Sequence, residues 1–136
     1  MARTSFTGPV ASTNGFEGAI TGNVTGNVTG NVTGDLTGVV IGTVQSLSGA
    51  GAVNITTATT KLTTTGSAQA LTLANGATGQ FKTIIHAVDG GSAVLTPTTK
   101  TGFTTITFTN AGDSAVLQYM ATQGWMIVAL NGAVAA

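Results

Sequence analysis

Few side chains in this chain could carry out acid–base or metal chemistry. Its 136 residues include no cysteine, one histidine (His86) and four carboxylates, which are Glu17, Asp35, Asp89 and Asp113. Glycoside hydrolysis needs two carboxyl groups facing each other across one site, and calcium needs several closely spaced oxygen ligands. Asp89 and Asp113 instead occupy the turn-like contexts DGG and AGDS, where Asp supports backbone hydrogen bonds. We therefore predict structural roles for both, and no catalytic residue, cofactor or metal site.

His86 lies between Ile85 and Ala87 in a predicted strand, and we expect it to share a face with Ile84 and Val88. A metal ligand or a general base normally needs partner side chains. One hypothesis is that three copies of the chain gather three His86 rings near a common axis. The interpretation that we favour is a histidine packed in a core or an interface.

Aromatic side chains could serve a different chemistry, the stacking of sugar rings. Phe103, Phe108, Tyr119 and Trp125 all fall within strand patterns of the last third of the chain. A host glycan is therefore one conceivable ligand of this region. Core packing is the commoner fate of aromatic residues in strands, and we favour it here.

Four Asn-x-Thr sequences match the acceptor pattern for N-glycosylation, beginning at Asn23, Asn27, Asn31 and Asn54. The first residues lack the apolar run of a secretory signal. We therefore interpret these motifs as by-products of the repeat, and expect their Asn and Thr side chains to hydrogen-bond along or between chains.

Composition limits the class of protein. Four basic and four acidic residues leave the chain neutral, and only 6% of its residues are charged. The basic residues are scattered, so we expect no nucleic-acid binding, which requires clustered Lys and Arg. No stretch approaches 18 consecutive apolar residues, so we expect no membrane span. So few charges protect a monomer poorly against self-association.

The elements that must position these residues are predicted to be strands. Thr and Val are abundant and favour strands, Gly is frequent and favours turns, and the residues that favour helices are scarce. We predict an all-β protein with an extended, intertwined trimeric stalk followed by a small β-sandwich or barrel.

The stalk is predicted from a four-residue repeat over residues 16–44, best seen in TGNVTGNVTGNVTGDLTG. Glycine and an apolar residue alternate on one face of an extended chain, and Thr and Asn occupy the other. The apolar column, which we predict to form the core of a homotrimer, comprises Phe16, Ile20, Val24, Val28, Val32, Leu36, Val40 and Val44.

A free-energy argument favours several copies over one. Ordering four residues costs about 4–8 kcal/mol of backbone entropy, whereas burial of one Val returns about 1.5–3 kcal/mol. Three chains wound together would bury the Val column and satisfy backbone groups between chains. A monomeric β-solenoid is the alternative for the repeat, although four residues make a short side. An ice-binding Thr array is the main alternative outside assembly.

Beyond the repeat, residues 45–60 lose the period and are predicted to be a linker. Residues 61–136 are predicted to form a β-rich C-terminal knob. Its seven expected strands are KLTTT, QALTLA, QFKTIIHAVD, SAVLTP, TTITFT, SAVLQYMA and GWMIVAL. They are separated by turn sequences such as NGATG and NAGD.

The order of these segments resembles that of a known family. The opening ARTSFTGPVASTNGF followed by GNVTG repeats, and the later landmarks LTLANGATGQFKTI, AGDSAVL and GWMIV, together cover nearly the whole chain. They resemble tailed-bacteriophage virion proteins of the head-fibre and capsid-decoration type.

This resemblance implies a homotrimer on the exterior of the capsid, made in the host cytoplasm, with the knob outward. Residues 1–15 would form an arm on the major capsid protein, with Arg3, Phe6, Pro9 and Val10 as contacts. The expected function is that of a non-enzymatic capsid decoration or cement protein. The alternative is a short head or tail fibre whose knob binds a host surface glycan or receptor.

Overall fold

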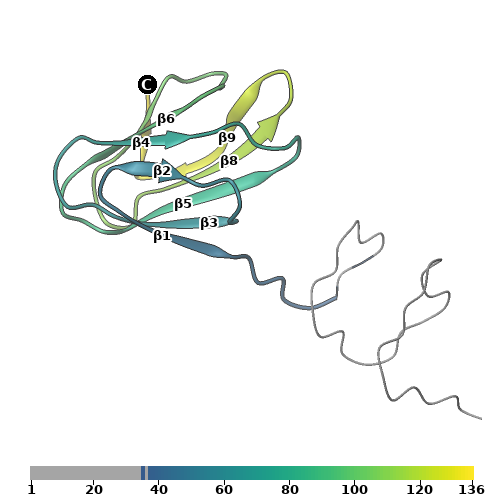
Figure 1. Cartoon of the computed structure of the whole chain (residues 1–136), viewed down its shortest axis with the longest axis horizontal. Coiled ribbons are helices and arrows are strands. Elements are labelled where there is room, and N and C mark those ends of the chain that lie inside the picture. Colours follow the sequence, from purple (N-terminus) through teal and green to yellow (C-terminus); the bar gives the residue numbers. More distant parts are fainter. Residues whose placement is uncertain (1–34, 36) are drawn as a thin grey trace, which may run out of the picture. The chain divides into compact units, whose positions relative to one another are not determined.

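The structure is a computed structural model that describes Asp35 and residues 37–136 (Figure 1). Within these residues the chain is all-β, with ten strands and no helix. Residues Thr37–Ala136 form one compact unit. The predicted arm and most of the predicted stalk lie outside the described residues, which include only Asp35 and residues 37–44 of the repeat.

The strands form two five-stranded mixed sheets that make a sandwich-like domain. Sheet A has the order β1-β3-β5-β8-β9, and sheet B has the order β10-β7-β6-β4-β2. The strands of sheet A are β1 (Val44–Ser48), β3 (Thr59–Thr63), β5 (Phe81–Val88), β8 (Ser114–Met120) and β9 (Gly124–Asn131). Those of sheet B are β2 (Gly51–Val53), β4 (Gln69–Leu73), β6 (Ala93–Pro97), β7 (Ile106–Phe108) and β10 (Val134–Ala135).

The first six strands alternate between the two sheets. In sheet A, β1, β3 and β5 are parallel neighbours, and β2, β4 and β6 are parallel neighbours in sheet B. Each pass of the chain therefore adds one strand to each sheet, as the coils of a β-solenoid do. The remaining strands, β7 to β10, are added in antiparallel pairs.

The segment predicted to be a linker, residues 45–60, contains β2, most of β1 and the start of β3. This difference arises because the segment forms strands without the four-residue period, and only a few of its apolar residues face the core. Leu47 of β1 packs against the core, and Val53 at the end of β2 is buried. The seven strands predicted after residue 60 correspond to β3 to β9.

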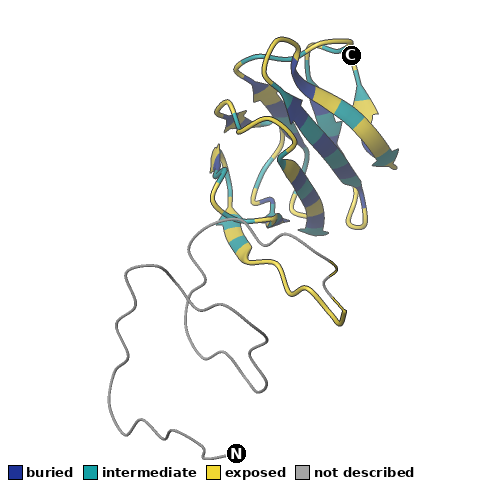
Figure 2. Cartoon of the chain, turned by 90° about the vertical axis from the view of Figure 1, so that its right-hand side faces the viewer, coloured by how far each residue is buried: buried dark blue, intermediate teal, exposed yellow. Residues whose placement is uncertain are grey.

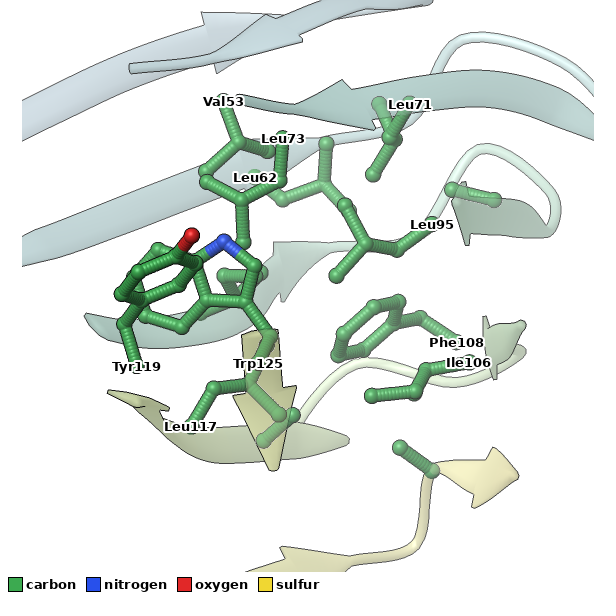
Figure 3. Close-up of a cluster of buried hydrophobic side chains, with 14 residues drawn as sticks. Val53, Leu62, Leu71, Leu73, Leu95, Ile106, Phe108, Leu117, Tyr119 and Trp125 are labelled. Carbon is green, nitrogen blue, oxygen red and sulfur yellow. The ribbon is translucent and has the colours of Figure 1, made fainter. Parts of the chain in front are cut away.

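The core lies between the sheets, and buried and exposed residues alternate along most strands (Figure 2). Trp125 of β9 is fully buried, and its ring meets Tyr119 edge-on at a centroid distance of 5.3 Å (Figure 3). The indole Nε1–H donates a 2.9 Å hydrogen bond to the carbonyl oxygen of Ala74. This bond satisfies the one polar atom that the buried indole carries.

Candidate interaction surface and buried polar groups

His86 is buried inside the sandwich, as the favoured interpretation predicted. Its Nε2 lies 2.9 Å from Thr64 Oγ1, which is also 2.7 Å from the carbonyl oxygen of Gly91. The single hydroxyl proton of Thr64 serves the Gly91 carbonyl, so the imidazole Nε2–H donates to Thr64 Oγ1. Among the described residues His86 Nδ1 has no hydrogen-bond partner. The ring is therefore bound within one chain, to Thr64, whose hydroxyl also contacts the loop at Gly90 and Gly91.

The expectation that His86 shares a face with both Ile84 and Val88 is half correct. Ile84 is buried beside His86, whereas Val88 is exposed. The register of β3 and β5 shifts between Leu62 and Thr63, which pair with His86 and Val88 respectively. This bulge inserts one extra residue and turns Val88 outward.

Asp89 and Asp113 have the structural roles predicted for them. Asp113 Oδ2 accepts hydrogen bonds from the backbone N–H groups of Asn110 and Thr109, at 2.9 and 2.7 Å. These two bonds, that of Asn110 foremost, lower the pKa of Asp113. Asp89 Oδ1 accepts a 2.8 Å hydrogen bond from the N–H of Gly91. Both carboxylates therefore hold turns, as expected for Asp in these contexts.

Lys82 is a buried polar residue that the sequence prediction missed. Its side chain is fully buried, and its Nζ donates 2.9 Å hydrogen bonds to the carbonyl oxygen and to Oγ1 of Thr57. Burial lowers the pKa of this amine to about 8. A signal was present, because strict alternation along residues 80–89 puts Lys82 on the same face as Ile84.

A network of hydrogen bonds extends this polar region to β1. Gln45 Oε1 accepts from Thr60 Oγ1 at 2.9 Å and from the N–H of Asn54 at 3.0 Å. Asn54 Oδ1 in turn accepts from the Thr57 hydroxyl at 2.7 Å. The interior of sheet A is therefore partly polar. Lys82, Thr57, Asn54, Gln45 and Thr60 form one hydrogen-bonded network, and His86 with Thr64 forms a separate one.

The four aromatic residues considered for sugar stacking belong to the core or pack against it. Trp125, Phe108 and Tyr119 are buried, and Phe103 packs against the core. The core-packing interpretation is confirmed for all four. The exposed aromatic side chain of the described region is Phe81, which the sequence prediction did not single out.

The most apolar exposed surface is what we call the outward face of sheet A. The exposed fraction of its large apolar side chains ranges from 39% for Met126 to 59% for Val44. Lys61 is the only ionisable side chain that strands β1, β3, β5, β8 and β9 turn outward. The apolar residues of this face are Val44, Phe81, Ile85, Val88, Val116, Met126 and Val128.

The outward face of sheet B differs from that of sheet A in the size of its side chains. Apart from Val134 it exposes small residues, and no strand of this sheet carries an ionisable side chain. Its members are Ala52, Ala70, Thr72, Val94, Thr96, Thr107 and Val134. The structure thus distinguishes a face with bulky apolar side chains among Ser, Thr and Gln residues from a face of smaller side chains.

Two residues of the predicted trimer core fall within the described region. Val40 and Val44 are both exposed in the single chain. Val39 and Ile41, beside them, are exposed as well. The other predicted core residues lie outside the described residues, as do the predicted capsid contacts Arg3, Phe6, Pro9 and Val10.

The described residues contain no detected pocket and no group of three or more potential metal-ligating side chains. No helix in the part of the chain that the structure describes is long and apolar enough to cross a membrane. No protein-family model matches the chain, and no curated protein matches it. The fold and its surfaces define an all-β domain with one bulky apolar outward face.

Proposed function

We propose that this chain is a structural virion protein of a tailed bacteriophage, a non-enzymatic decoration or cement protein that binds the capsid exterior as a homotrimer. The observation that carries the proposal is the order of its parts: an arm and a four-residue repeat precede an all-β domain. The likeness of the opening and of the repeat to head-fibre and capsid-decoration proteins supports the same assignment.

In this proposal residues 1–15 bind the major capsid protein, residues 16–44 join three chains, and the β domain points outward. Phe6, Pro9 and Val10 supply apolar contacts, and Arg3 pairs with an acidic group on the shell. Three linked arms engage three equivalent sites, so avidity holds the trimer even where each contact is weak. Binding across neighbouring capsomers stabilises the assembled lattice by mass action.

The boundary between repeat and domain lies at Val44. Val44 is the last apolar residue of the repeat and the first residue of β1. In the sequence the repeat therefore runs directly into β1, although its residues 37–43 are exposed and form no strand. In this proposal the repeat links the β domain to the arm.

A short fibre that binds a host glycan through its β domain is the other function considered. The aromatic residues proposed to stack sugars are in the core or packed against it, so this function has lost its sequence support. No observation favours it over decoration.

Deletion of residues 1–15 tests the proposal. We expect the shortened chain to remain trimeric in sedimentation equilibrium and to lose co-sedimentation with heads of the phage that encodes it. The full chain is the positive control, and an Arg3→Ala variant should reduce binding by less than the deletion does. Retained capsid binding by the shortened trimer would contradict a role for the arm and favour attachment through the β domain.

A further inference from the structure

We infer that the outward face of sheet A is the surface through which the β domains of neighbouring copies pack against one another in the oligomer. This inference rests on the proposed function, because it takes the homotrimer as given and names the contact that completes it. Its occupant is a second copy of this chain.

The first argument is continuity between the repeat and this face. The apolar column of the repeat advances by four residues through Val40 to Val44. In β1 the side chain of Leu47 points into the core, so Val44, Ser46 and Ser48 point outward. The column that we predict to bind other copies therefore ends on the outward face of sheet A.

The second argument is the position of β1. This strand is the edge of sheet A and pairs only with β3 in the described domain. More than thirty residues of repeat and arm precede it. If the repeats of several copies associate, their β1 strands enter the domains close to the common axis. Sheet A is then the first sheet that the chain enters, and the outward residues of β1 are the first that the repeat reaches.

The third argument is the chemistry of the face. Phe81 and Ile85 of β5 and Val116 of the neighbouring β8 place large apolar side chains in the middle of the sheet, beside Thr83, Ser114 and Gln118. Soluble monomers rarely expose large contiguous apolar patches. A second copy offers the same surface, whose one ionisable side chain, Lys61, is long enough to keep its amine at the rim.

The experiment uses the full chain with the double substitution Phe81→Lys and Ile85→Lys. Three copies then place six cations on the contact surface, and we expect association to weaken by more than about 100-fold in sedimentation equilibrium. The matched control is Thr72→Lys with Thr96→Lys, which puts the same charges on adjacent strands of sheet B. We expect the control to associate like the wild type.

Cross-linking provides a second readout that does not depend on added charge. The natural chain has no cysteine, so Ile85→Cys and Ala70→Cys each introduce a single thiol. With a short bismaleimide we expect covalent dimers from Ile85→Cys and none from Ala70→Cys. The reverse pattern would place sheet B at the contact and overturn the inference.

Two further outcomes separate this inference from the proposed function. A trimeric double-lysine variant that still binds capsids would overturn the contact face and leave the decoration function intact. A trimeric variant that loses capsid binding would make the capsid protein the occupant, which also overturns the inference. A monomeric wild-type chain would contradict the trimer itself and, with it, both proposals.

Discussion

Sheets A and B share one design but distribute their polar residues in opposite ways. Each contains three parallel strands followed by antiparallel additions. Sheet B is apolar inside and presents mainly small residues outside. Sheet A buries Thr60, Lys82 and His86 on its inner side and exposes bulky apolar residues on its outer side.

This difference matters because the contrast in polarity between the two faces of a sheet fixes how that sheet packs. A strand that slips by one residue moves its whole apolar set to the opposite face, so a strong contrast specifies the register firmly. In sheet B that contrast is strong. In sheet A it is weaker, and the hydrogen bonds of Lys82 and His86 supply part of the specification instead.

The same comparison explains why sheet A is the better candidate for a protein contact. A buried, hydrogen-bonded amine contributes little net stability, because its desolvation offsets much of the gain from its hydrogen bonds. The bulky apolar residues on the outward face of sheet A are about half exposed, so they would contribute more to stability if another surface covered them. The outward face of sheet B carries smaller residues and would gain less from such a contact.

The largest expected effect comes from the interior of sheet B. Leu95 of β6 is fully buried, and Leu95→Ala should lower the free energy of unfolding by about 2–5 kcal/mol, because it leaves a cavity in a packed core. Val94→Ala, one residue away on the half-buried outward side, is the control and should cost less than about 1 kcal/mol. Urea denaturation at fixed chain concentration measures both. If the two variants lost the same free energy of unfolding, the interior of sheet B would not be its firmly packed side.

The next effect is a pH dependence that originates inside sheet A. The pKa of Lys82 is about 8 in the folded chain and near 10.5 in the unfolded chain. Between these values the unfolded state binds more protons, so stability rises with pH and levels off above about 10.5. Each unit of pKa difference corresponds to about 1.4 kcal/mol as an upper limit.

Lys82→Met should remove this rise, because it removes the titrating amine. The matched control, Lys61→Met, changes an exposed lysine of the same sheet and should keep the rise. Thermal unfolding from pH 7.5 to 10.5 compares the three proteins. If wild type and Lys82→Met gave parallel profiles, the buried amine would not be the source.

The strands could be predicted from the sequence where turn residues mark their ends, and were missed where such marks or large apolar residues are absent. Strands β3 to β9 were predicted because turn residues bound each of them, whereas the two-residue strand β10 was missed. The aromatic core was favoured because its members fall within those strands. β1 and β2 were missed, because QSLSGAGAV has few large apolar residues and its alternation is visible only once Leu47 and Val53 are known to face the core.

The surface could not be predicted, for a different reason. Alternation along β5 shows that Phe81 and Ile85 share a face, but not which face is inside. Lys82 and His86 occupy the opposite face. The favoured packing of His86 beside Ile84 would put that face inside, whereas the charge of Lys82 would put it outside. Parallel pairing with β3 and the hydrogen bonds of Lys82 to Thr57 decide the matter, and both depend on residues distant in sequence.

The smallest expected effect concerns Lys61, the one ionisable residue on the outward face of sheet A. If this face contacts a second copy, Lys61→Met should tighten association by about three- to tenfold, because the amine no longer has to be kept at the rim. Thr72→Met adds the same side chain to the outward face of sheet B and should leave the dissociation constant unchanged within about twofold, as expected of a surface away from the contact. Sedimentation equilibrium over a dilution series measures both constants. Tightening by Thr72→Met alone would reverse the assignment of the two faces, because added apolar area strengthens association only where the surface is covered.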